Sequence, residues 1–188
     1  MATRPHARER LVDAASTLFY RDGINATGID RIIARAGVAK ASLYNNFAGK
    51  DELVAAYLER RLAQVARLLD ELAAAHPAAQ RVDAFLERLE GAARRGSLRG
   101  CAFANAAVEV PTSSPARVVI ERFYQRLAHF FADALGVDVR DPSVRQLVIC
   151  YDGAMAIAAA LRDPSVFTTA RVLADTVADA VVRGPRGE

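Results

Sequence analysis

The sequence contains few of the residues that build metal centres, disulfide frameworks or catalytic dyads. Among its 188 residues there are two cysteines, three histidines and no tryptophan. Cys101 and Cys150 lie far apart in the chain with no cysteine or histidine partner nearby, so we expect neither a zinc site nor a disulfide framework. His6, His76 and His129 fall on separate predicted helices, which argues against a metal triad or a catalytic dyad.

Long apolar segments are also missing. There is no run of about 18 uncharged apolar residues, so no membrane span is expected. The first ten residues (MATRPHARER) are not followed by the apolar core of a signal peptide, and we therefore expect a cytoplasmic location. The chain offers no nucleophile–base pair, no phosphate-binding glycine loop and no metal-ligand spacing, so we expect neither an enzyme nor a cofactor.

The composition is that of a folded helical protein. Hydrophobic residues make up 52% of the chain and charged residues 25%. Alanine, leucine and arginine are frequent, which favours helix, and the alternation typical of strands is scarce. We predict an all-α fold of about nine helices, with a small three-helix domain over residues 1–50 and a larger helical domain over 51–188. The predicted helices cover residues 3–22, 28–36, 39–46, 49–75, 78–95, 98–109, 115–135, 141–161 and 163–183.

One segment near the N-terminus carries the functional prediction. Residues 27–47 (TGIDRIIARAGVAKASLYNNF) form two short helices on either side of Gly37, and Thr27 with Asp30 fits a variant of the capping box. Helices of two turns bury little surface alone. Crossed at a tight turn and backed by the preceding helix, they make a helix-turn-helix whose second helix can enter the major groove of DNA.

The outer face of the second short helix carries side chains that can contact DNA bases or phosphates. Asparagine can pair with adenine edges, serine with several bases, and lysine with guanine or phosphate. Simpler interpretations stay open: Tyr44 as a core aromatic, the lysines as solvated charges, and the asparagines as helix-end residues. Thr27 and Lys50, each at the start of a helix, are placed to meet phosphates. The predicted DNA-contacting residues are Thr27, Lys40, Ser42, Tyr44, Asn45, Asn46 and Lys50.

The charge distribution agrees with a polyanionic partner. The first 50 residues hold eight lysines and arginines against four acidic residues, whereas the remainder is slightly acidic within a formal net charge of +3. A basic N-terminal segment on a mildly acidic body indicates that this segment meets nucleic acid. A solvated basic surface would give the same asymmetry.

The segment resembles the TetR family of bacterial repressors. The resemblance rests on the pattern Ile33-Ala34-x-Ala36-Gly37-Val38-x4-Leu43-Tyr44-x2-Phe47-x2-Lys50-x2-Leu53, and residues 7–58 match the family's DNA-binding domain nearly end to end. It implies that Tyr44 and Lys50 contact phosphates and that Thr27 anchors the first short helix. Ala39 stands where the family often has a serine cap, and Ala41 where it often has glycine.

The last two predicted helices suit a twofold interface. Small residues in 150–160 (CYDGAMAIAAA) allow close helix approach, and the final helix carries one apolar side. The resemblance likewise implies a homodimer that binds a palindromic operator. An ordinary bundle within one chain is the alternative. The apolar residues of the final helix are Val166, Ala170, Leu173, Val177 and Val181.

Aromatic and polar residues on the middle helices are candidates for a small, mostly apolar ligand, although each could be plain core. A ligand-released repressor is therefore expected; the alternative is a regulator without such a ligand, controlled by a protein partner, redox state or expression level. Cys101 follows several arginines and is either a reactive thiol or a small buried residue. Residues 100–109 (GCAFANAAVE) resemble a segment that recurs in one branch of the family. The ligand candidates are Tyr57, Phe85, Phe103, Asn105, Glu109, Phe123, Tyr124, Tyr151 and Met155.

Overall fold

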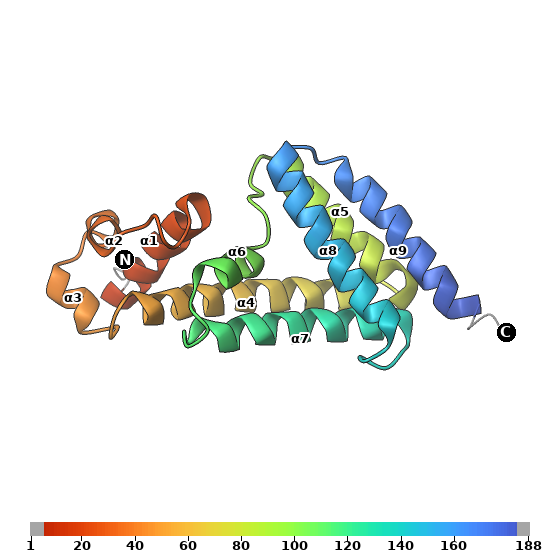
Figure 1. Cartoon of the computed structure of the whole chain (residues 1–188), viewed down its shortest axis with the longest axis horizontal. Helices are drawn as coiled ribbons and strands as arrows, with labels where there is room; N and C mark the ends of the chain where they lie inside the picture. Colours follow the sequence, from red (N-terminus) through yellow and green to blue (C-terminus); the bar gives the residue numbers. More distant parts are fainter. Residues whose placement is uncertain (1–5, 184–188) are drawn as a thin grey trace. The chain divides into compact units, whose positions relative to one another are not determined.

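The computed structural model describes residues 6–183. Over this range the chain forms nine α-helices, one short 3-10 helix and no strand, which confirms the predicted all-α fold (Figure 1). The elements are α1 (Ala7–Asp22), α2 (Ile29–Ala36), α3 (Lys40–Tyr44), α4 (Lys50–Ala75), η1 (Ala78–Gln80), α5 (Arg81–Arg94), α6 (Ala102–Glu109), α7 (Ala116–Leu135), α8 (Pro142–Leu161) and α9 (Val166–Arg183).

Helix α1 forms because its apolar residues recur with the spacing of a helix. Leu11, Ala15 and Leu18 are buried along one side, as their spacing predicts. The chain leaves the helix at Gly23, whose φ of 94° is a conformation that other residues rarely adopt. The predicted N-cap at Thr3 lies outside the described residues.

Helices α5 and α6 begin later than the sequence predicts. The predicted start of α5 at residue 78 is instead a single 3-10 turn, and the α-helix begins at Arg81. The predicted start of α6 at residue 98 is wrong by four residues, because Gly96 (φ 68°) and Gly100 (φ 80°) both take left-handed conformations. Two such residues interrupt helical propagation, so α6 starts only at Ala102.

Aspartates precede both α8 and α9. Asp141 Oδ1 accepts a hydrogen bond from the backbone nitrogen of Ser143 at 2.9 Å, which caps α8. Asp163 Oδ1 accepts the corresponding bond from Ser165 at 2.9 Å, but there the first turn stays irregular and α9 begins at Val166.

The described residues pack into two compact units. The first unit comprises the chain up to Ala63 together with Ala102–Arg122, and the second comprises Gln64–Cys101 together with the chain from Phe123 onward. The division therefore falls within α4 and within α7. The predicted boundary at residue 50 concerns the division of functions and stays a prediction. The first core includes Leu11, Phe19, Ile32, Leu43, Leu53 and Leu58, and the second includes Phe85, Leu86, Phe123, Leu127, Phe131 and Phe167.

Candidate nucleic-acid interface and ligand site

Helix α3 is short and is held by two buried side chains. Leu43 is fully buried and Phe47 is 2% exposed, and α3 packs on α1. The other side of the helix faces solvent: Tyr44 has 53% of its surface exposed, and Lys40 and Asn45 are exposed as well. The interpretation of Tyr44 as a core aromatic is therefore wrong. An aromatic ring exposed to this extent beside polar groups suits contact with a partner molecule.

The junction between α2 and α3 is set by a glycine turn and by an arginine of α1. Gly37 adopts the left-handed conformation, with φ 61° and ψ 42°. Arg10 Nη1 donates hydrogen bonds to the carbonyls of Gly37 (3.1 Å) and Ala36 (3.4 Å). These carbonyls end α2 and would otherwise lack partners in the helix. Sequence reasoning missed Arg10, because nothing local separates it from the other arginines of α1.

The side chains predicted to contact bases differ in whether they already bond to other groups of the chain. Lys40 Nζ lies 3.2 Å from Asp30 Oδ1, and both groups are exposed, so the ion pair is weak and easily exchanged. Asn46 Nδ2 donates to the carbonyl of Ser42 at 2.7 Å, which favours its interpretation as a helix-end residue. The exposed side chain of Asn45 is directed to solvent.

Helix α3 starts without a side-chain cap. Ala39 occupies the N-cap position in an extended conformation and offers no capping hydrogen bond, as its identity predicts. Lys50, the first residue of α4, is half-buried. Its position at the N-terminus of a long helix suits an anion, because the first backbone amides of a helix have no partner within it.

Thr27 does not have the geometry predicted for it. Its side chain is fully buried, and its hydroxyl donates to the carbonyl of Gly23 at 2.7 Å. The predicted phosphate contact through this hydroxyl is therefore not supported. The predicted capping box is also wrong, because Gly28 is the N-cap of α2 and no side chain caps it. Thr27 instead closes the turn between α1 and α2.

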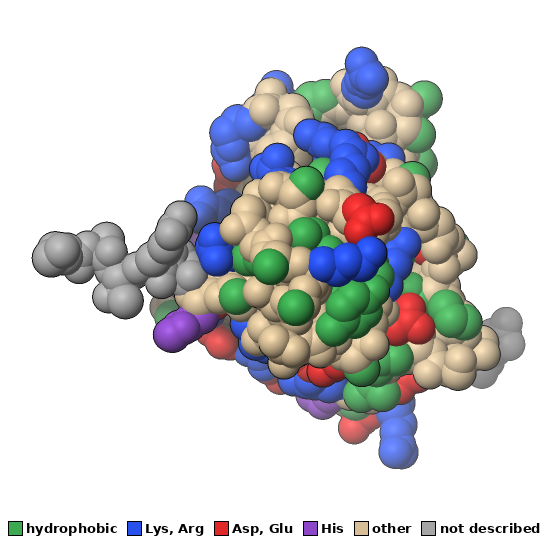
Figure 2. Space-filling view, turned by 90° about the vertical axis from the view of Figure 1, so that its left-hand side faces the viewer, with side chains coloured by type: hydrophobic (Ala, Val, Ile, Leu, Met, Phe, Trp, Pro, Cys, Tyr) green, Lys and Arg blue, Asp and Glu red, His purple; other side chains and the backbone are tan. Residues whose placement is uncertain are grey.

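Basic side chains surround this helix-turn-helix. Figure 2 views the chain from the end where α2 and α3 lie, and it shows lysine and arginine side chains together with acidic groups. Arg8 lies over the ring of Phe47, 5.1 Å from its centroid. Asp22 pairs with Arg21 (2.7 Å) and Arg31 (2.9 Å), and the hydrogen bond from Arg21 lowers the pKa of Asp22 to about 2. These two arginines and one aspartate together carry a net charge of +1.

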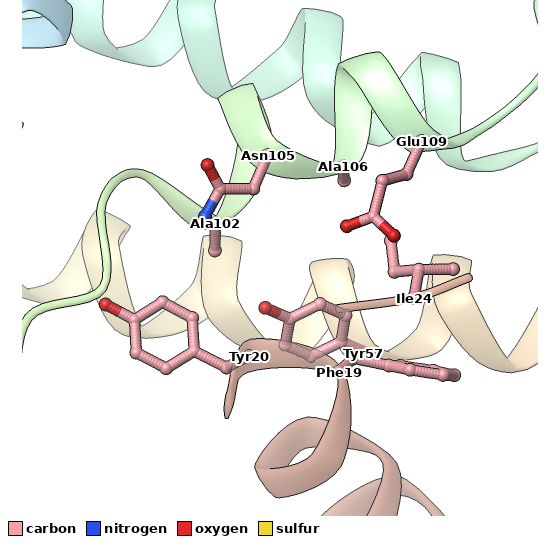
Figure 3. A pocket seen from close by; sticks show the side chains of 8 residues that line it. All are labelled: Phe19, Tyr20, Ile24, Tyr57, Ala102, Asn105, Ala106 and Glu109. Atoms are coloured by element: carbon pink, nitrogen blue, oxygen red, sulfur yellow. The ribbon is translucent and has the colours of Figure 1, made fainter. Parts of the chain in front are cut away.

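Four of the predicted ligand residues belong to the first unit. Tyr57, Asn105 and Glu109 line a small cavity among α1, α4 and α6 (Figure 3), and Phe103 is buried on α6. The cavity holds about 10 Å³, room for about one water molecule. It is therefore far smaller than a typical small-molecule pocket.

The other five predicted residues lie in the second unit, where their aromatic members pack together. Phe85 stacks on Tyr151 with 5.7 Å between ring centroids, and Phe123 lies 5.1 Å from Tyr124. Met155 is buried on the same helix as Tyr151. The structure therefore divides the predicted ligand residues into two groups, one in each unit.

A half-buried carboxylate adjoins this aromatic group and was missed by the sequence reasoning. The hydroxyl of Tyr124 donates to Asp152 Oδ2 at 2.8 Å, whereas Asp152 Oδ1 is buried and has no partner. Burial raises the pKa of Asp152, although the bond from Tyr124 opposes the shift. Burial also raises the pKa of Tyr151, whose hydroxyl is hydrogen-bonded to the thiol of Cys101. Cys101 is only 4% exposed, which favours its interpretation as a small buried residue.

A larger cleft lies elsewhere in the second unit, between the C-terminal half of α4 and α5. It holds about 500 Å³, within the range of small-molecule pockets. Leu68 and Leu72 supply apolar surface, and Glu71, Arg88 and Arg95 supply charge. None of the nine predicted ligand residues lines it. No local pattern in the sequence predicts this cleft. Its lining residues come from successive turns of two different helices, and their composition is that of an ordinary protein surface.

Helices α8 and α9 pack on each other and leave apolar side chains in solvent. Of the residues predicted for a dimer interface, Leu173 is 53% exposed, whereas Ala170 is buried within the chain. Helix α8 is the one described helix that is long and apolar enough to cross a membrane by length and composition, with 33% of that stretch buried. A helix with one core face and one apolar outer face has the same composition. The exposed apolar residues are Ile149, Ile157 and Leu161 on α8 and Val172 and Leu173 on α9.

Comparisons with known proteins agree with this architecture. Residues 11–57 match the family model for bacterial regulatory proteins of the tetR family. A TetR-family transcriptional regulator of Streptomyces coelicolor is 32% identical, with a TM-score of 0.84 over 93% of this chain and 95% of that one. A tetR-type regulator of Streptomyces avermitilis is 31% identical, with a TM-score of 0.79 over 92% and 98%.

The curated relatives match over shorter lengths. The transcriptional activator FasR of Mycolicibacterium smegmatis is 44% identical over 59 residues, which are 31% of this chain and 27% of FasR. The regulator LmrA of Bacillus subtilis is 33% identical over 85 residues, 44% of this chain and 45% of LmrA. The matched part is thus less than half of each of these two proteins. These four similar proteins are all transcriptional regulators.

Proposed function

The chain belongs to the TetR family of bacterial transcriptional regulators, which bind DNA, and from this premise we propose that it is a dimeric repressor released from a palindromic operator by a small-molecule ligand. The main observation behind the proposal is the exposed face of α3. On it, the side chain of Tyr44 is half exposed, whereas Leu43 and Phe47 are buried and hold the helix in place. A bacterial regulator that binds chromosomal DNA must be in the cytoplasm, so the proposal includes a cytoplasmic location.

The proposed DNA contacts follow from exposure and chemistry. Lys40 and Asn45 are the exposed polar side chains of α3 suited to base edges, with Ser42 beside them. Tyr44 and Lys50 are proposed to bind phosphates on either side of the groove, which would fix the register of α3. Asn46 is assigned a supporting role, since its amide already bonds within the turn.

A twofold dimer is supported by the apolar outer faces of α8 and α9. Exposed isoleucines and leucines on adjacent turns of two packed helices favour burial against an identical surface. Two copies of α3 would then read two half-sites about 34–36 Å apart, or a multiple of that spacing. This is why the operator is proposed to be palindromic.

A ligand site in the second unit is supported by two features. The aromatic group around Phe85, Phe123 and Tyr151 offers apolar walls, and Asp152 Oδ1 offers a buried acceptor that lacks a partner. The cleft between α4 and α5, which none of these residues lines, is a second candidate position and holds about 500 Å³. Ligand binding is proposed to favour a conformation in which the two copies of α3 no longer fit successive half-sites.

The proposal is tested by selecting bound fragments from genomic DNA and measuring their affinity by fluorescence anisotropy. Tyr44→Ala and Lys50→Ala should each weaken binding about tenfold, because a dimer loses two phosphate contacts. Lys50→Ala should also reduce the slope of log K against log salt by about 2. Arg67→Ala, which removes an exposed charge from the C-terminal half of α4, is the matched control and should change neither quantity. Unchanged affinity in both test variants would refute the assigned interface.

A further inference from the structure

Helix α6 has no part in the DNA contacts, dimer interface or ligand site proposed above. Its polar residues Asn105 and Glu109 lie one turn apart, and Figure 3 shows both side chains directed from α6 toward the cavity that Tyr20 and Tyr57 line. Two polar residues on the buried-facing side of an otherwise apolar helix are costly unless they bond to something. The partner of Glu109 is in the helix-turn-helix.

Glu109 is fastened to the turn between α1 and α2 by two hydrogen bonds. Its carboxylate oxygen Oε2 accepts from the backbone nitrogen of Asn25 at 2.7 Å, and its backbone carbonyl accepts from Asn25 Nδ2 at 3.3 Å. The carboxylate also lies against Gly23, where an added Cβ would sit 3.3 Å from Oε2. A hydrogen bond to a charged acceptor is the stronger kind, so this contact fixes the turn firmly.

The turn that Glu109 holds determines where α2 begins. Within it, the hydroxyl of Thr27 bonds to the carbonyl of Gly23 at 2.7 Å, and the side chain of Ile24 is buried. Helix α2 starts two residues after Thr27 and leads directly through Gly37 into α3. A displacement of this turn would therefore move the start of the helix-turn-helix.

The other end of this connection is fixed by α7. Arg117 Nη2 donates to the carbonyls of Ala107 (2.8 Å) and Val110 (2.7 Å), which end α6. These bonds satisfy carbonyl groups that the C-terminus of a helix leaves open. A continuous set of hydrogen bonds thus runs from α7 through the end of α6 to the turn before α2, all within the first unit.

We propose that Glu109 is a positioning residue for DNA recognition: its carboxylate holds the α1–α2 turn in the conformation that sets α2 and α3 for the operator. The cavity beside it has room for about one water molecule, so the carboxylate can exchange its bond to Asn25 for water when α6 shifts. This inference rests on the proposed DNA-binding function.

The test compares variants of the full chain on the selected operator and on a random duplex. Glu109→Ala removes the acceptor, and Glu109→Gln keeps an oxygen in the same place without the charge. Glu121→Gln, on the exposed surface of α7, controls for the loss of one negative charge near DNA. Hydrogen–deuterium exchange of residues 23–28 and the melting temperature are measured for each variant.

Glu109→Ala should weaken operator binding about tenfold and speed exchange in residues 23–28, with little change on random duplex. Glu109→Gln should remain within about threefold of the unmodified chain, and Glu121→Gln should lose no affinity. Equal operator affinity for Glu109→Ala and Glu121→Gln would overturn the inference, as would an equal loss on both duplexes with a lower melting temperature. Failure of the unmodified chain to prefer any duplex would instead refute the proposed function.

Discussion

Charged substitutions on the outer face of α8 should separate the proposed dimer into monomers. Ile149 and Ile157 expose 65% and 48% of their surface in the single chain. Complete burial of an isoleucine side chain is worth about 1.5–3 kcal/mol, so covering these exposed parts is worth about 1 kcal/mol each. Each residue occurs twice in a twofold dimer, which gives about 4 kcal/mol, or roughly a thousandfold in Kd.

The double variant Ile149→Asp/Ile157→Asp should therefore raise the dimer dissociation constant at least a thousandfold, since buried carboxylates add a further cost. Sedimentation equilibrium over a concentration series measures that constant. The matched control is Val108→Asp/Val118→Asp, which adds the same two charges at residues that are 87% and 60% exposed on α6 and α7. A double variant that dimerises as tightly as the control, or an unmodified chain that is monomeric throughout, would refute the reasoning.

Two further predictions concern stability. Gly37→Ala should lower the free energy of unfolding by about 1 kcal/mol in urea, because φ is 61° while the nearest atom to an added Cβ, Arg10 Nη1, is 3.9 Å away and causes no clash. Gly153→Ala, inside α8 with no atom within 4 Å of the added Cβ, should not destabilise; equal losses in both would contradict the conformational explanation. Asp152→Asn should flatten the pH dependence of stability: burial raises the folded-state pKa of Asp152, so the unmodified chain should gain stability as pH falls through that pKa, whereas the amide keeps an acceptor for Tyr124 and does not titrate. Identical pH profiles in thermal melts would refute the role of this carboxyl group.

Local pattern was sufficient to predict the helix-turn-helix. The spacing of Leu11 and Leu18, the glycines at 23 and 37, and the apolar anchors Leu43 and Phe47 all act within a few residues of one another. Each element therefore carries its own signal. The start of α6 was misplaced because a helical pattern does not reveal that Gly100 takes a left-handed conformation.

Contacts between distant residues could not be predicted. Arg10 bonds to a carbonyl 27 residues away, and Glu109 bonds to Asn25 across 84 residues. Such bonds depend on how helices pack and leave no trace in local composition. The same limit explains Thr27, whose position before α2 suggested a phosphate contact although its hydroxyl is used inside the turn.

The central claim is that α3 enters the major groove of DNA, and methylation protection tests it most directly. Dimethyl sulfate modifies guanine N7 in the major groove and adenine N3 in the minor groove, so the two grooves give separate signals. The account predicts protection of guanine N7 in two patches about one helical turn, or a multiple of it, apart, and about tenfold more protein for half-protection with Tyr44→Ala. Protection confined to adenine N3, or a pattern unaffected by that substitution, would contradict it.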